Sequence, residues 1–394
     1  MEKKSYPIYN CKLYLGEISF ILLQLFGIFK PLTWNTKWKT LIYYLYSIFM
    51  ITIYFYFDIS ILLFLLLKAQ NIDNEMESLY HFLAFFTVFF KMITIFLHSK
   101  IAIELVNLFK NKLCQPRDDV ELKILQNTSY SCRFYTILYL FITNSTSISL
   151  FLIPPSKRSD FPLPFKMWIP YSLNSRLLYF LTYIHQGLGT TMGACVTSAI
   201  EGIALMTILQ ICAQYEIFIY RLNLLSQLST KKNYNESFIY NCETKIIKDC
   251  VELHCHIFTI GKKLNNLFDS AIFVQFFVSM LGLGAITFQL SRLTVTDPRL
   301  WGLMCALSVT LVQIFLYCIF GEQIKTKSFA TINEIYEMNW STITNKTKRN
   351  LMLIMIRAAK PLNFMGFKLI IMSIGTFVQI VKSAYSAYNL LKGF

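Results

Sequence analysis

The stretch LIYYLYSIFMITIYFYFDISILLFLLL, residues 41–67, contains a single charged side chain, Asp58. A helix needs about 20 apolar residues to cross the hydrocarbon core of a bilayer, and this stretch exceeds that length. The rest of the chain has the same character, because 55% of its 394 residues are hydrophobic and only 15% are charged. Soluble domains carry about 25% charged residues. The composition therefore predicts an integral membrane protein embedded in a lipid bilayer, and it disfavours a soluble enzyme or a nucleic-acid-binding module.

Six further segments are long and apolar enough to span a membrane: 79–97, 134–153, 177–200, 270–290, 300–320 and 362–384. No ten-residue alternation of apolar and polar residues indicates a barrel, so helices are the expected spanning elements. Glu17 and Gln24 interrupt the apolar segment 13–29, which is expected to lie in the membrane interface instead. The predicted fold class is an all-α integral membrane protein with seven transmembrane helices.

The distribution of positive charge predicts the orientation of these spans. With the N-terminus inside, 26 of the 37 lysines and arginines fall in inner segments and eight fall in outer segments. Cytoplasmic loops collect Lys and Arg, so the N-terminus is expected in the cytoplasm and the C-terminus outside. A G-protein-coupled receptor has the opposite orientation, which disfavours that class of seven-helix protein.

The chain is expected to form one subunit rather than separate domains. The cytoplasmic N-terminus with the interfacial helix is expected at 1–40, and spans one to four at 41–200. A cytoplasmic helical extension at 201–269 is followed by spans five and six at 270–320. Cytoplasmic anchor helices at 321–361 precede the last span at 362–391.

The outer halves of several spans combine aromatic residues with small polar groups. Thr87 and Lys91 lie in span two, Asn144 and Ser145 in span three, and Tyr179 and Tyr183 in span four. A mostly apolar cavity with a few hydroxyl and amide groups suits a small organic ligand. The apolar neighbours assigned to the same pocket are Ala84, Val88, Ile148, Met304 and Cys305. Packing between helices is the alternative interpretation of each residue taken singly.

The last span carries a polar stripe. Gln379, Ser383, Ser386 and Asn389 recur at spacings of four and three residues, which place them along one side of a helix. In lipid such a stripe must find partners or water. It predicts either hydrogen bonding between helices or a helix that lines an aqueous pore, with Leu390 as an apolar constriction.

The inner segment 321–361 contains the apolar run 351–356, which is too short to span and too apolar to face water. It packs either within the subunit or against a neighbouring subunit, with Leu353 at the contact. Pro361 cannot donate a backbone hydrogen bond, so it predicts a bend between this segment and the last span.

No cofactor or metal motif accompanies these features. Cys250, His254, Cys255 and His256 crowd one inner segment, but their order fits no common structural zinc spacing. The chain also lacks a glycine-rich phosphate loop and a nucleophile elbow, so the sequence predicts no enzyme.

Several motifs resemble those of the insect odorant receptors. Residues 183–186, Tyr-Ile-His-Gln, look like the family's Tyr-x-x-Gln feature, and His254, residues 264–268 and Gln275 resemble the stretch that leads into span five. Trp340, Arg357, Lys360 and Pro361 precede a last span that ends KSAYSAYNLL, close to the family's Ser-Tyr-x-x-Leu pattern. The Thr-Tyr-x-x-x-x-x-Gln motif of the related gustatory receptors is absent.

The resemblance implies a ligand-gated cation channel of four subunits around a pore lined by the last helix. It also implies a cytoplasmic anchor that includes Trp340, Leu353, Arg357 and Pro361, and an odorant pocket in the outer half of spans two, three, four and six. The chain looks like a ligand-tuning subunit that assembles with the family's co-receptor in the plasma membrane of sensory dendrites. A G-protein-coupled receptor and a gustatory-type channel are the alternatives.

Overall fold

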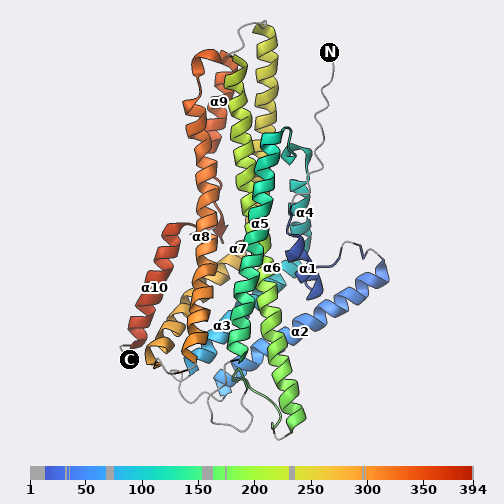
Figure 1. Cartoon of the computed structure of the whole chain (residues 1–394), viewed down its shortest axis with the longest axis vertical. Helices are drawn as coiled ribbons and strands as arrows, with labels where there is room; N and C mark the ends of the chain where they lie inside the picture. The colour runs from blue at the N-terminus through green and yellow to red at the C-terminus, as the bar shows by residue number, and fades with distance from the viewer. Residues whose placement is uncertain are drawn as a thin grey trace.

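The computed structural model describes residues 14–392 except 32, 35, 68–74, 153–162, 174, 230–235, 295–296 and 298. The described chain is almost entirely helical (Figure 1). Its α-helices are α1 (Glu17–Leu25), α2 (Lys37–Leu67), α3 (Met76–Leu97), α4 (Ser99–Phe109), α5 (Asp119–Leu152), α6 (Arg176–Ser229), α7 (Glu236–Arg292), α8 (Arg299–Glu337), α9 (Asn345–Ala358) and α10 (Ile374–Lys392). Two 3₁₀ turns, η2 (Lys112–Cys114) and η3 (Trp340–Thr342), and a hairpin of β1 (Met365–Gly366) and β2 (Ile370–Ile371) complete it.

The long helices divide the molecule into two halves along its length. The lower half in Figure 1 holds α2, α3 and α10 together with one end of each of α6, α7 and α8. The upper half holds α9 and the continuations of α6, α7 and α8 beyond the predicted spans. Residues 201–229, 236–269 and 321–337 of the predicted cytoplasmic segments therefore continue α6, α7 and α8, whereas α9 is a separate helix.

Five of the described helices are long and apolar enough to cross a membrane: α2, α3, α6, α7 and α8. They include the predicted spans 41–67, 79–97, 177–200, 270–290 and 300–320. Residues 134–152 of the predicted span 134–153 lie in α5, and residue 153 lies outside the described residues. Only residues 374–384 of the predicted span 362–384 lie in α10. Both helices are more polar than the five that qualify. The chain is a multi-pass helical membrane protein, and the count of seven spans stays a prediction.

Helix α6 forms the centre of the bundle. In its most apolar 18-residue window 89% of the residues are buried, against 28% in the corresponding window of α2. A helix that is apolar all round belongs in a core, whereas none of the other described residues covers the exposed apolar face of α2. The lipid tails of a bilayer therefore supply the surroundings that α2 requires.

Helix α1 packs on α6, in the region predicted to lie in the membrane interface. Its nine residues are too few to cross the hydrocarbon core, since a helix rises about 1.5 Å per residue. Leu23 on one face is fully buried in the main core, while Ile21 and Leu25 on the other face are exposed.

The last span begins later than the sequence predicts. Residues 362–373 do not continue into the helix, because the chain there forms the β1–β2 hairpin, and α10 starts at Ile374. Met372 donates its backbone N–H to the carbonyl of Phe364, which closes the hairpin at its base. A bend was expected at Pro361, between α9 and the last helix. The structure has the β1–β2 hairpin there, which connects α9 to α10.

Candidate functional site

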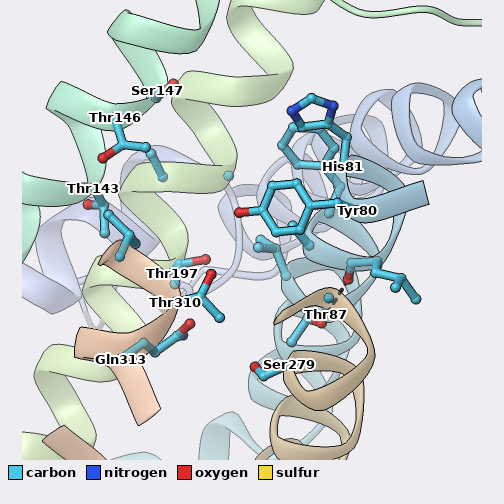
Figure 2. Close-up of a pocket in the computed structure, with 18 of the residues that line it drawn as sticks. Tyr80, His81, Thr87, Thr143, Thr146, Ser147, Thr197, Ser279, Thr310 and Gln313 are labelled. Atoms are coloured by element: carbon cyan, nitrogen blue, oxygen red, sulfur yellow. Dashed lines mark hydrogen bonds between the residues drawn. The ribbon is translucent and has the colours of Figure 1, made fainter. Parts of the chain in front are cut away.

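A cavity of about 160 Å³ lies inside the lower half, between α3, α5, α6, α7 and α8. Figure 2 shows its polar lining, with Tyr80 and His81 on one side and Thr143, Thr146 and Ser147 on the opposite side. The complete lining is Tyr80, His81, Leu83, Ala84, Phe85, Thr87, Val88, Tyr139, Thr143, Thr146, Ser147, Thr190, Gly193, Ala194, Thr197, Gln275, Val278, Ser279, Gly282, Val309, Thr310 and Gln313. Apolar surface with a few converging hydroxyl and amide groups is the usual composition of a small-molecule site.

Three polar atoms of this lining are buried without a hydrogen-bond partner: His81 Nε2, Tyr139 Oη and Thr197 Oγ1. Most other hydroxyl groups of helices α3, α5 and α6 in the lining donate to a carbonyl of their own helix, as Thr87 does to Leu83. A buried polar atom left unpaired costs about 1–3 kcal/mol. The cavity thus holds hydrogen-bonding capacity that a ligand can satisfy.

Next to the cavity, a buried network of polar side chains joins α3, α6, α7 and α8. Lys91 Nζ of α3 lies 2.6 Å from Glu201 Oε1 of α6, and both side chains are at most 5% exposed. Gln313 of α8 donates to the same oxygen at 2.7 Å and exchanges hydrogen bonds with Gln275 of α7. Gln275 also donates to Ser279. Because Gln275, Ser279 and Gln313 line the cavity as well, a ligand there contacts groups that hold the ion pair.

A loop covers the cavity from the other side. Gln186 of α6 is fully buried and clamps Phe165, accepting from its backbone N–H and donating to its carbonyl, both at 3.0 Å. The Phe165 ring packs edge-on against His81 and Phe85, with centroids 4.9 and 5.7 Å apart. Since both partners line the cavity, Phe165 forms an outer layer over it. The clamp also gives a structural role to the glutamine of the Tyr-x-x-Gln feature.

The sequence-predicted pocket residues of α3 coincide with this cavity. Ala84, Thr87 and Val88 are part of its lining. Lys91 lies one turn further along α3. Its side chain contacts Glu201 and is not part of the lining. The structure therefore places Lys91 in the supporting network.

The other predicted pocket residues do not line the cavity, which differs from the expectation. On α5 the inward face is Tyr139, Thr143, Thr146 and Ser147, so Ser145 and Ile148 face outward and are exposed. Asn144 instead donates to the carbonyl of Leu140 and accepts from the Cys195 thiol. Met304 and Cys305 are exposed on α8, about one turn before the lining residue Val309.

Tyr179 and Tyr183 lie too close to the start of α6 to reach the cavity. Their rings pack together with centroids 6.0 Å apart. The lining of α6 begins at Thr190, which is about 10 Å further along the helix than Tyr183. Thr190, Gly193, Ala194 and Thr197 follow helical spacing, so a search for small and hydroxyl-bearing residues at that spacing would have found them.

The polar stripe of α10 faces away from the rest of the subunit. Ile380 and Ala384 are buried against α7 and α8, whereas Gln379, Ser383, Ser386 and Asn389 are exposed. Leu390 belongs to the helix, but its side chain lies outside the described residues. The stripe therefore makes no helix–helix hydrogen bond to the described part of its own subunit.

The predicted assembly residues gather at and beside α9. Leu353 is 61% exposed, next to the exposed Met352 and Ile356. Arg357 stacks on the ring of Phe258, while the Trp340 indole donates to the carbonyl of Ile335. Pro361 is half-buried where the chain leaves α9. Met352, Leu353 and Ile356 present an apolar face that the described residues leave uncovered.

A family model described as "7tm Odorant receptor" matches residues 71–385. This chain belongs to the odorant receptor family. The family comprises sensory receptors and not enzymes, and the receptor's motifs noted above are consistent with that membership.

Relatives of this receptor include odorant receptor 9a of Drosophila melanogaster, 26% identical over 59% of this chain and 56% of that protein. Odorant receptor 47b of Drosophila melanogaster is 23% identical over 64% of this chain and 60% of that protein. The matches thus span somewhat more than half the length of these relatives. The structure of the insect olfactory receptor OR5 from Machilis hrabei in complex with eugenol has a TM-score of 0.82 at 15% identity, covering 96% of this chain and 97% of that chain. This likeness shows that the two share a fold.

Proposed function

We propose that this receptor is the ligand-tuning subunit of an odorant-gated, weakly selective cation channel. The observation that carries the proposal is the cavity between α3, α5, α6, α7 and α8, with its mostly apolar lining and three unpaired polar atoms. A cavity of about 150 Å³ can hold benzene, so 160 Å³ suits a compact ring or a short chain. One hydrogen-bonding group on such a volatile molecule would pair with His81, Tyr139 or Thr197.

The size of the cavity also limits the affinity. Burying about 200 Å² of a small ligand contributes about 5 kcal/mol at 25 cal/mol per Å², before the ligand's loss of freedom is subtracted. Binding this weak suits a receptor that releases its ligand quickly and responds to changes in concentration.

The channel part of the proposal rests on α10 and on the family. The exposed polar face of α10 requires water or other subunits, and a central aqueous pore between four subunits provides both. Assembly with the family's co-receptor would supply the remaining copies of this helix. In this arrangement the upper half in Figure 1 lies in the cytoplasm, and the receptor resides in the plasma membrane of sensory dendrites.

The test is to fill the cavity with a phenylalanine and to compare the result with a phenylalanine placed outside it. Ala84→Phe adds a ring inside the cavity, whereas Ile148→Phe adds bulk at a 57% exposed position on the surface of α5. Each variant is expressed with the co-receptor and its currents are recorded across a panel of volatiles. We expect Ala84→Phe to raise the half-maximal concentration at least about tenfold, the equivalent of 1.4 kcal/mol, for activating ligands. Ile148→Phe is expected to behave as the native receptor, and an unaltered ligand profile in Ala84→Phe contradicts the site.

A further inference from the structure

A second cavity, of about 550 Å³, lies between α7, the end of α9 and the β1–β2 hairpin, away from the ligand cavity. Its lining is Phe258, Thr259, Lys262, Asn265, Asn266, Asp269, Arg357, Lys360, Pro361, Leu362, Asn363, Met365 and Lys368. Four of these residues are cations and only Asp269 is acidic. The concave surface is therefore strongly positive.

The four cations of this cavity lack acidic partners. Among the described residues, no carboxylate oxygen lies within 4.0 Å of the charged nitrogens of Lys262, Arg357, Lys360 or Lys368. The adjacent Lys263, by contrast, forms an ion pair with Glu104. Like charges gathered in a concave surface repel one another and raise the local concentration of anions. The arrangement thus favours a bound anion carrying more than one charge.

Two of the cations are held in place by their surroundings. Arg357 lies over the Phe258 ring, 3.6 Å from its centroid, and donates to the carbonyl of Lys360 at 3.3 Å. Lys368 and Phe367 occupy the two central positions of the hairpin turn with φ of +57° and +46°. Such turns favour Asn-Gly, because other side chains are strained at positive φ.

The strained turn is fastened at both ends. The Phe367 ring packs against Phe273 of α7 with centroids 4.9 Å apart. Asn265 of α7 donates to the carbonyl of Asn363 and accepts from the N–H of Met365. Strain retained by surrounding contacts is a feature of ligand sites. Here the contacts of Phe367 and Asn265 with their neighbours keep Lys368 in the lining of the cavity.

The position of the cavity points to the source of the anion. Residues 258–269 immediately precede the predicted start of span five at residue 270, and the hairpin immediately precedes α10. With the orientation proposed above, the cavity opens at the level of the cytoplasmic leaflet, whose anionic headgroups bind basic pockets between helices. We propose that this cavity binds the multiply phosphorylated headgroup of an anionic inner-leaflet lipid. Bound there, the headgroup would bridge α7, α9 and the hairpin that leads to α10.

The experiment measures lipid binding by the purified full-length receptor. Vesicles of phosphatidylcholine are compared with the same vesicles containing a bisphosphorylated phosphoinositide, and soluble inositol trisphosphate is the competitor. The cavity variant combines Lys262→Gln, Lys360→Gln and Lys368→Gln. The matched control removes the same charge at exposed lysines outside the cavity, with Lys100→Gln, Lys110→Gln and Lys245→Gln.

We expect the cavity variant to bind the phosphoinositide vesicles at least about tenfold more weakly, and the control to stay within about twofold of the native receptor. Binding of soluble inositol trisphosphate without any binding to the phosphoinositide vesicles would identify a free inositol phosphate as the ligand and overturn the lipid assignment. If both variants lose the same amount of vesicle binding, the binding depends on net charge alone, and the assignment of the site is wrong. Unchanged lipid binding with loss of oligomers in the cavity variant would assign the cavity to an acidic segment of a neighbouring subunit.

These outcomes are independent of the proposed channel function, because the assay requires neither a volatile ligand nor an ionic current. A receptor that fails to respond to volatiles but binds the lipid through this cavity would contradict only the proposed function.

Discussion

Lys91 is the residue whose role the structure changes most. Its ammonium group is buried at 1% exposure and contacts the Glu201 carboxylate. The pair is acceptable in the interior because Gln313 donates a further hydrogen bond to Glu201. Removing one partner of such a pair leaves a buried charge, which usually costs more than removing both.

We predict that Lys91→Met destabilises the receptor by about 3–5 kcal/mol, because Glu201 is left buried without its cation. The measurement is thermal unfolding of the purified receptor in detergent. The double variant Lys91→Met with Glu201→Leu is expected to recover much of the loss. If the double variant is no more stable than Lys91→Met alone, the two side chains do not act as a pair.

At the scale of the element, α10 has two faces that differ in what they contact. Ile380 and Ala384 pack inward, and the polar stripe is exposed on the opposite face. Tyr385, which lies outside the stripe, is 63% exposed as well. The exposed surface of α10 is thus wider than the stripe alone.

Cysteine substitution separates these faces in the assembled receptor. We predict that Ser383→Cys and Ser386→Cys react with a water-soluble thiol reagent at least about tenfold faster than Ile380→Cys and Ala384→Cys, since the reagent does not reach a buried thiol. The unmodified receptor is the background, because its Cys255 and Cys305 are already exposed. Similar rates on both faces would argue for packing through the stripe instead of a pore.

At the scale of the whole molecule, the apolar face of α9 has no partner within the described chain. Met352, Leu353 and Ile356 are each at least 50% exposed, although α9 lies far from the apolar lower half (Figure 1). Large exposed apolar patches mark interaction surfaces. A contact with neighbouring subunits is the simplest cover for this face.

We predict that Leu353→Asp prevents assembly, because a carboxylate buried without a partner costs several kcal/mol. Native gels or mass photometry of the receptor co-expressed with the co-receptor would show monomers in place of oligomers. Val120→Asp is the control, since Val120 is 48% exposed at the start of α5 and away from α9. Normal oligomers of Leu353→Asp would exclude α9 from the interface.

The sequence alone determined the class of this protein. The apolar run 41–67 and its counterparts identify a helical membrane protein, because the length of a hydrophobic run is a local property that needs no knowledge of contacts. Motifs such as residues 183–186 indicated the family, which the family model over residues 71–385 confirms. Ala84, Thr87 and Val88 were predicted from the composition of the outer half of span two, and all three line the cavity.

Only the tertiary structure decided which side of each helix faces inward. Lipid is as apolar as the protein core, so hydropathy does not distinguish Ile148, on the outer surface, from Val88, in the cavity. The pairing of Lys91 with Glu201 and the clamp of Gln186 on Phe165 join residues far apart in the chain. The hairpin before α10 likewise depends on Phe273 and Asn265 of α7 to hold its strained turn. Such contacts are set by the mutual packing of helices, which no single segment specifies.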